Sequence, residues 1–232
     1  MSNEQSYGQF CPVAMAAEIV CTRWTPLILR ELVSGSTRFG DLHRGLPRIS
    51  PTLLSKRLKQ LEEAGVIRRL ISSNPETIEY RLTPAGEELK TVVFDLGMWG
   101  QRWIETRNSL KNLDPSLLMW DMRRNLDPTP MPPRRYVIQI MYPELTPSRR
   151  NWWLIVEGGA TDLCHVDPGF DVDLYVTTDL RTMTAIWMGL STVDAEVISG
   201  RLQLTGDDRV KSTMQQWLGL SPFAAEKKRA TG

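Results

Sequence analysis

One short stretch constrains this chain more than any other: SPTLLSKRLKQLEEAG, from Ser50 to Gly65, has helix signals at both ends. The Ser50 hydroxyl suits an N-cap, and Pro51 falls at the first helical position, where its missing N–H costs nothing. Gly65 suits the left-handed residue that ends many helices. Between these ends, apolar residues at helical spacing predict one buried face, made by Leu54, Leu58 and Leu61.

The opposite face of this predicted helix is polar and basic, with Thr52, Ser55, Lys56 and Lys59. A helix whose start carries small hydroxyls and cations is typical of proteins that read the DNA major groove. An ordinary solvated helix has the same character, so the flanking sequence decides between the two interpretations. From Arg38 to Arg69 the chain has eight basic residues against three acids, which favours a phosphate-facing surface. The eight are Arg38, Arg44, Arg48, Lys56, Arg57, Lys59, Arg68 and Arg69.

The flanking patterns predict a winged helix. Residues 11–34 have two helical patterns, and residues 38–46 predict a third, short helix closed by Pro47. This short helix and the basic helix that follows it form a helix-turn-helix candidate. Residues 66–71 and 78–82 then predict two strands, joined by the turn-forming SSNPET. We expect the tip of this wing to reach phosphates or the minor groove.

A long helix follows the wing, because Thr83 and Pro84 repeat the cap-then-proline start and the apolar spacing continues to about residue 110. Such a helix carries more apolar surface than a small winged domain can bury. Its apolar residues are Leu89, Val92, Val93, Leu96, Trp99 and Trp103. We expect the surplus face to pack on a partner subunit, with packing on the second half of the same chain as the alternative.

Three segments between residues 10 and 110 carry recognisable motifs: CPVAMAAEIVCTRWTPLILREL, then RFGDLHRGLPRISPTLLSKRLKQLEEAGVI, then EYRLTPAGEEL. In these motifs and in their order, residues 10–110 closely resemble the HxlR-type winged helix regulators. The resemblance implies a DNA-binding transcription regulator that acts as a homodimer on an inverted-repeat operator in double-stranded DNA. It also implies that the helix from Ser50 enters the major groove, and that the N-terminal helix and the long helix after the wing form the dimer. Repression is the family's tendency.

Within this framework we assign candidate DNA contacts. Lys56 and Arg57 are expected to contact phosphate or guanine, although Arg57 adjoins the buried stripe and alternatively packs there. Ser50, Thr52 and Ser55 are expected to contact phosphates or base edges near the helix start. Lys59 is a weaker candidate, because Glu62 and Glu63 can pair with it on the same helix. Backbone contacts are predicted for Arg38 and for the wing residues Ser72, Ser73 and Arg81.

The second half predicts a separate α+β domain. Residues 114–125 form an amphipathic helix pattern, and the proline-rich DPTPMPPRR that follows reads as a semi-rigid connector. We therefore predict a mainly α winged helix domain at 1–112, a connecting helix and linker at 113–133, and an α+β domain at 134–232. In the last domain, strands are followed by helices, then one strand and one final helix. This order predicts a sheet covered by helices on one face.

The run from Asp171 to Leu220 resembles the C-terminal part of sterol-carrier-protein-2-like (SCP2-like) domains, chiefly through its GRLQLTGD step from strand to helix. The resemblance covers roughly residues 133–222 and implies an apolar cavity for a lipid-like ligand. Large, adaptable side chains are the physical candidates for lining it: Trp153, Phe170, Met183, Trp187, Met188 and Met214. The alternative for each is an ordinary place in the core.

Motifs for catalysis or metal binding are weak. Asp162, Cys164, His165 and Asp167 are conceivable metal ligands, but alternation along a strand sends Cys164 and His165 to opposite faces, so we predict no metal site. The sequence has no Ser/His/Asp order, glycine-rich phosphate loop or paired acids with supporting context, so we predict no cofactor and no enzyme. Cys11 precedes the first helix, where relatives can carry a redox-sensing thiol, and the helix N-terminus would favour its thiolate. We favour structural packing for Cys11.

Together these patterns predict a homodimeric transcription regulator whose second domain senses an apolar small molecule. The polar N-terminus, the absence of an apolar run of membrane-spanning length and an odd count of 3 cysteines favour a cytoplasmic protein without a membrane partner. The alternative function is a carrier of hydrophobic ligands, in which the winged helix serves mainly dimerisation.

Overall fold

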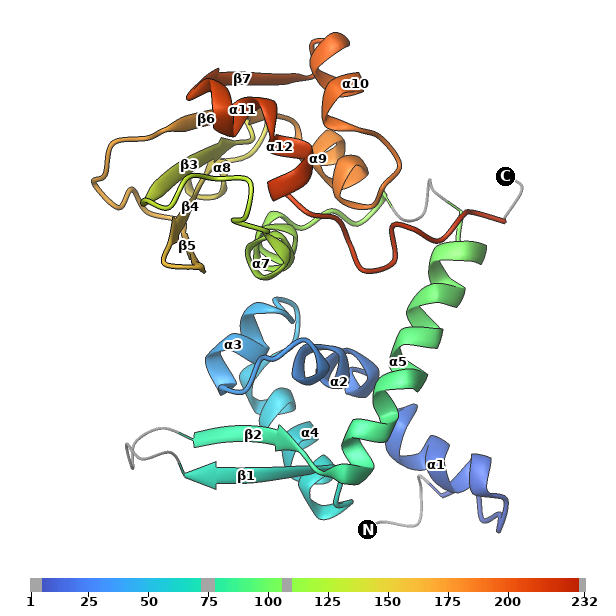
Figure 1. Cartoon of the computed structure of the whole chain (residues 1–232). Helices are drawn as coiled ribbons and strands as arrows, with labels where there is room; N and C mark the ends of the chain where they lie inside the picture. The colour runs from blue at the N-terminus through green and yellow to red at the C-terminus, as the bar shows by residue number, and fades with distance from the viewer. Residues whose placement is uncertain (1–5, 72–77, 106–109, 230–232) are drawn as a thin grey trace. The chain divides into compact units, whose positions relative to one another are not determined.

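The computed structural model describes residues 6–71, 78–105 and 110–229. The chain divides into two compact units, Met1–Gly97 and Met98–Gly232. The division falls inside the long helix α5 (Pro84–Trp103), so the domain boundaries predicted near residues 112 and 133 stay predictions. Each unit is described by itself below, with the elements labelled as in Figure 1.

The first unit is a winged helix-turn-helix, as the sequence predicts. Four helices come first, at Pro12–Val20 (α1), Thr25–Val33 (α2), Phe39–Arg44 (α3) and Pro51–Glu63 (α4). The antiparallel strands Ile67–Ile71 (β1) and Ile78–Leu82 (β2) form the wing, and α5 follows them (Figure 1). Residues 37 and 38 extend this small sheet, because Tyr80 N–H donates to the Thr37 carbonyl oxygen over 2.7 Å and Arg38 bridges to Glu79.

Local chemistry sets the ends of α4. The Ser50 hydroxyl accepts a hydrogen bond from the Leu53 N–H over 3.3 Å, and Pro51 takes the first helical position. Gly65 follows the C-cap with a φ of 71°, a left-handed conformation that glycine adopts without strain. Leu54, Leu58 and Leu61 are buried in the core of the unit, which fixes the face that α4 leaves to solvent.

A buried carboxylate supports the turn between α3 and α4. Glu31 on α2 is fully buried and pairs with Arg30 over 2.7 Å, while Arg30 also donates to the Gly45 carbonyl oxygen over 2.9 Å. Ser36 donates its hydroxyl to Glu31 as well. A Cβ at Gly45 would lie 2.0 Å from a Glu31 carboxylate oxygen, so only glycine leaves room for this cluster. The helix-turn-helix therefore rests on α2 through polar contacts as well as apolar packing.

Helix α5 has two apolar faces. Leu89 and Val93 pack against the core of the first unit. A second stripe at helical spacing is exposed, and it consists of Val92, Leu96, Trp99 and Trp103. Helix α1 also carries exposed apolar residues and has no buried residue of its own. The surplus of apolar surface expected from the sequence is therefore present in the single chain, although α5 ends at Trp103, short of the expected residue 110.

The second unit contains one mixed five-stranded sheet with the order β5-β4-β3-β6-β7. Its strands are Tyr136–Met141 (β3), Asn151–Glu157 (β4), Ala160–Cys164 (β5), Leu174–Thr178 (β6) and Leu202–Gly206 (β7). Strands β3, β4 and β5 form an antiparallel meander, β6 pairs parallel to β3, and β7 pairs antiparallel to β6. The helices are Pro115–Asn125 (α7), Pro147–Arg150 (α8), Leu180–Trp187 (α9), Val193–Ile198 (α10), Asp208–Ser212 (α11) and Met214–Trp217 (α12).

One face of this sheet packs against helices, which agrees with the α+β arrangement predicted. Ile138, Leu154 and Val176 point into the same core as Met119 and Met122 of α7. Helices α9 and α12 add buried residues to that core, among them Met183 and Trp217. The helix α7, expected to connect domains, thus contributes to the core of the second unit. The single last helix that we predicted is wrong, because the chain breaks at Thr213 into α11 and α12.

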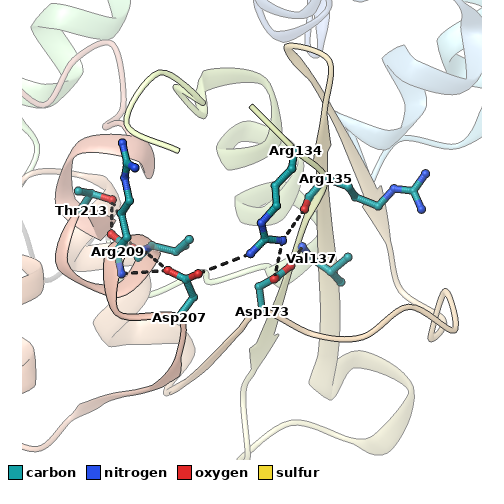
Figure 2. A network of polar contacts seen from close by, with 8 residues as sticks. Arg134, Arg135, Val137, Asp173, Asp207, Arg209 and Thr213 are labelled. Carbon is teal, nitrogen blue, oxygen red and sulfur yellow. Dashed lines mark hydrogen bonds and ion pairs between the residues drawn. The ribbon is translucent and has the colours of Figure 1, made fainter. Parts of the chain in front are cut away.

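The proline-rich segment before β3 is held by an arginine and two carboxylates (Figure 2). The Arg134 guanidinium lies between Asp173, at 2.8 Å, and Asp207, at 3.5 Å, and stacks 3.8 Å from the centre of the Tyr136 ring. The hydrogen bond to Asp173 raises the pKa of Arg134, which favours its charged form. Asp173 also accepts from the Val137 N–H, over 2.9 Å. This segment is therefore pinned to the sheet.

Across the described parts of the chain, every helix is too short or too polar to cross a lipid bilayer.

Candidate nucleic-acid interface

The solvent face of α4 presents the small hydroxyls and the lysines that the sequence indicated. Thr52, Ser55, Lys56 and Lys59 are exposed, as is Ser50 at the cap. The Ser50 hydroxyl is partly committed, because it accepts from Leu53 N–H as the helix cap. The burial of the leucine stripe fixes the orientation of this face, so the four polar side chains stand together on the outside of one helix.

The basic side chains of α4 differ in how far they are engaged. Lys56 makes no side-chain hydrogen bond or ion pair to any described residue. Lys59 lies 3.7 Å from Glu63, but both side chains are largely exposed, and such pairs contribute little. Arg57 is half-buried and donates to the Arg23 carbonyl oxygen over 3.1 Å and to the Gln60 side chain over 2.7 Å. Arg57 therefore ties α4 to the loop before α2, which is the packing alternative considered from the sequence.

Arg38 lies beside the wing strand β2, and Arg81 is part of that strand. Arg38 is exposed, and its backbone forms the antiparallel β-bridge to Glu79. Arg81 donates from Nε and Nη2 to one Glu79 carboxylate oxygen, at 3.1 and 2.8 Å. Glu79 therefore neutralises one of the two cations that we expect at the DNA backbone. Ser72 and Ser73, the other predicted wing contacts, lie outside the described residues.

Three more exposed cations lie near α4 or on the wing. Arg48 lies in the turn before α4, and Arg68 and Arg69 lie on β1, where Arg68 is opposite Arg81 in the ladder. They were counted in the basic cluster of the sequence but not assigned as contacts. Their signal was available, because a basic pair at the start of a wing strand is exposed on at least one face. Arg44, by contrast, pairs with Asp41 over 3.0 Å.

The residues predicted to line a ligand cavity take different positions in the second unit. Met183, Trp187 and Met214 are buried in its core, and Met188 packs against it. Trp153 is buried, and Phe170 is exposed with the Arg135 guanidinium 4.6 Å from its ring centre. A hollow of about 470 Å³ lies elsewhere in this unit, and none of the six lines it. It is formed by Pro128, Thr129, Met131, Pro132, Pro133, Arg134, Arg135, Val156, Glu157, Gly158 and Gly159.

Cys11 is exposed at the N-cap of α1 rather than packed in a core. Hydrogen bonds from the backbone N–H of Ala14, and then of Val13, lower the pKa of its thiol. The structural packing that we favoured for Cys11 is therefore wrong for the single chain. Within the described residues, no three potential metal ligands of the His, Cys, Asp or Glu type gather at one place.

Comparison with known proteins finds relatives of the N-terminal part of the chain. A family model described as HxlR-like helix-turn-helix matches residues 19–108. YvaP of Bacillus subtilis (strain 168), named an uncharacterized HTH-type transcriptional regulator, is 38% identical over 100 residues, which are 42% of this chain and 93% of YvaP. Rv3095 of Mycobacterium tuberculosis (strain ATCC 25618 / H37Rv) carries the same description and is 47% identical over 93 residues. These residues are 40% of this chain and 58% of Rv3095.

Among solved structures, the crystal structure of PA1607 is 30% identical and has a TM-score of 0.41. The match covers 43% of this chain and 69% of that one. The family match ends at residue 108 and does not extend to the sheet of the second unit.

Proposed function

This chain belongs to the HxlR-like helix-turn-helix family of transcriptional regulators, and from this premise we propose that it acts as a homodimer on an inverted-repeat operator, with α4 in the major groove. The observation that carries the proposal is the pairing of a buried leucine stripe with an exposed hydroxyl and lysine face on α4. Residues at the start of a recognition helix contact base edges, and cations beside them contact phosphates.

In this proposal Lys56 is the main phosphate contact of α4, because its ammonium group is not engaged by any described residue. Thr52 and Ser55 contact base edges or phosphates near the helix start. Arg38, Arg48 and the wing arginines Arg68 and Arg69 extend the positive surface along the DNA backbone. Arg57 acts indirectly, by holding α4 against the loop before α2.

The dimer uses the exposed apolar residues of α1 and α5. Leu96 and Trp99 on α5 are 55% and 57% exposed in the single chain, and Val13 on α1 is 76% exposed. Contiguous apolar surface of this kind on a monomer marks an interaction site, and a second copy presents the same stripe. An isologous dimer has two-fold symmetry, which an inverted repeat matches.

The second unit serves as the sensory half and binds an apolar effector. The support for this role is that its core contains methionine and tryptophan side chains, which adapt to irregular apolar molecules, including Met183, Trp187 and Met214. An SCP2-like identity for this unit and repression as the direction of regulation belong to the same proposal. The location in the cytoplasm follows from the role and is proposed with it.

Fluorescence anisotropy with labelled DNA from upstream of the protein's own gene tests the proposal. The protein should bind this duplex more tightly than a scrambled duplex of equal length, with a protein-to-site ratio of two. When a basic residue of α4 is replaced in this assay, Lys227→Ala provides the charge-matched control, because it removes one positive charge away from α4. Equal affinity for both duplexes, with no salt dependence, would contradict DNA reading and leave a ligand carrier as the remaining function.

A further inference from the structure

The C-terminal segment of the second unit, residues 221–229, returns to the end of α5, and we call this segment the tail. The Arg229 N–H donates to the Arg102 carbonyl oxygen over 2.8 Å, and Lys228 Nζ donates to the Ile104 carbonyl oxygen over 2.7 Å. The last carbonyl groups of a helix have no partner within the helix. The tail supplies two donors at this end of α5, and one carries the positive charge that a helix C-terminus favours.

An ion pair reinforces the contact. Arg102 Nε lies 2.7 Å from a Glu226 carboxylate oxygen, and both side chains are 29% exposed. The hydrogen bond from Arg102 lowers the pKa of Glu226, so the carboxylate is charged at neutral pH. The pair is less exposed than most surface pairs, and its partners are separated by more than a hundred residues. It joins the C-terminal end of the chain to α5 rather than to a local neighbour.

The other end of the tail is attached to α9. The Ser221 N–H donates to the Trp187 carbonyl oxygen over 2.8 Å. Ala224 packs on Gly189, where an added Cβ would lie 2.9 Å from the Ala224 Cβ. From the α5 side, the buried Gln101 reaches the Met188 carbonyl oxygen with Nε2 at 3.5 Å. The ends of α5 and α9 and the tail therefore meet at one place in the second unit.

The same residues connect to the core in which we expect the effector. Trp187 and Met188 lie at the C-terminal end of α9, and both are candidate ligand contacts. Met214 lies in α12, and only a few residues separate α12 from the tail. A molecule that displaces α9 or α12 would also displace the tail, because the tail follows α12 in the chain and is hydrogen-bonded to α9.

We propose that the tail is a regulatory strap that caps the C-terminal end of α5 and transmits changes in the core around α9 and α12 to that helix. The inference rests on the proposed function, because the exposed stripe of α5, including Trp99 and Trp103, is the proposed dimer surface. When the strap is in place, the last turn of α5 is ordered and the stripe is complete. When it is released, that turn frays, the dimer weakens, and DNA affinity falls with it.

The test uses full-length variants and two readouts. Lys228→Ala removes one cap and Glu226→Gln removes the ion pair, whereas Lys227→Ala removes the neighbouring charge, which is exposed and makes no side-chain bond to a described residue. Hydrogen exchange of peptides covering residues 98–105 reports the order of the last turn of α5. Sedimentation equilibrium reports the dimer. We expect about tenfold faster exchange and a dimer weakened about fivefold in the first two variants, and no change in the third.

Each other outcome overturns the strap. Unchanged exchange in both Lys228→Ala and Glu226→Gln would mean that the tail does not order the end of α5. Faster exchange with an unchanged dimer would make the tail a passive cap. An equal effect of Lys227→Ala would mean that only net charge matters. None of these readouts uses DNA. Absence of operator binding in all variants and in the unmodified protein would contradict the proposed function, whereas hydrogen exchange and sedimentation alone would still decide whether the strap exists.

Discussion

The Arg57 guanidinium donates a hydrogen bond to the backbone carbonyl oxygen of Arg23 over 3.1 Å, and this contact joins α4 to the loop before α2. The neighbouring Lys56 has no such tie to a described residue. Two adjacent basic residues, both candidate DNA contacts from the sequence, therefore differ in their contacts. Arg57 is tied to the loop before α2, whereas the Lys56 ammonium group, which we propose as a phosphate contact, is not engaged by a described residue.

Replacing Arg57 with alanine tests this division. The change removes two hydrogen bonds from a half-buried side chain, so the free energy of unfolding should fall by about 1–2 kcal/mol. The dependence of DNA affinity on salt should keep its slope, because no phosphate contact is lost. Urea unfolding and anisotropy titrations at several salt concentrations measure both. A slope lowered by about one unit would place Arg57 on the DNA instead.

Gly86 in the first turn of α5 permits a close approach to the backbone just before β1. A Cβ at this position would lie 2.2 Å from the Val66 carbonyl oxygen, a backbone atom that cannot move aside independently. Gly86→Ala should therefore lower the free energy of unfolding by more than about 2 kcal/mol. Gly40→Ala is the matched control, because a Cβ there meets nothing within 4 Å and alanine favours its helix, for a gain of up to about 0.5 kcal/mol. Urea unfolding compares the two, and equal effects would contradict the close contact.

Glu196 in α10 gives the second unit a predicted pH dependence. It is 4% exposed and accepts hydrogen bonds from Arg201, Ser191 and Ser199, of which the bond from Arg201 lowers its pKa most. A lowered pKa in the folded state means that this stabilisation is present above the ordinary glutamate value of 4.5 and is lost as pH falls through the lowered value.

Glu196→Gln should therefore cost about 1–3 kcal/mol of unfolding free energy at pH 7, because Arg201 loses its buried charged partner. The difference from the unmodified protein should shrink as the pH is lowered from about 5 towards 3. Urea unfolding at a series of pH values measures it. A difference that is constant over this range would show that the charge of Glu196 makes no contribution.

The exposed stripe of α5 predicts how the dimer can be broken. Leu96→Glu places a charge on the stripe and should weaken dimerisation at least about a hundredfold, as expected for an unpaired charge buried in an interface. Lys90→Gln changes net charge by the same amount on the exposed opposite side of the helix and should leave the dimer intact. Sedimentation velocity separates monomer from dimer. A Leu96→Glu protein that remains dimeric would place the interface elsewhere.

The sequence predicts those features that local chemistry decides. Ser50, Pro51 and Gly65 mark the ends of α4 because caps and glycine turns depend on a few adjacent residues. The partners of Arg57 and of Arg30 were not predictable, since the carbonyl groups of Arg23 and Gly45 approach them only through the packing of several helices. The parallel pairing of β3 with β6 was missed for the same reason, because two strands and their loops separate them.

The predicted single last helix fails at Thr213 for a different reason. Val210, Met214 and Trp217 have helical spacing, yet they reach the core from two short helices, α11 and α12. The Trp217 indole N–H donates to the Val210 carbonyl oxygen over 2.7 Å and links the two helices. Periodicity alone does not distinguish one helix from two short helices that follow each other directly in the chain.

The salt dependence of DNA binding by Lys56→Ala tests the central claim most directly. If α4 lies in the major groove with Lys56 on a phosphate, this variant should bind the upstream DNA about tenfold more weakly, and the slope of log affinity against log salt should fall by about one unit. Lys227→Ala should change neither quantity. An unchanged slope and affinity for Lys56→Ala would mean that the exposed face of α4 is solvated rather than bound to DNA.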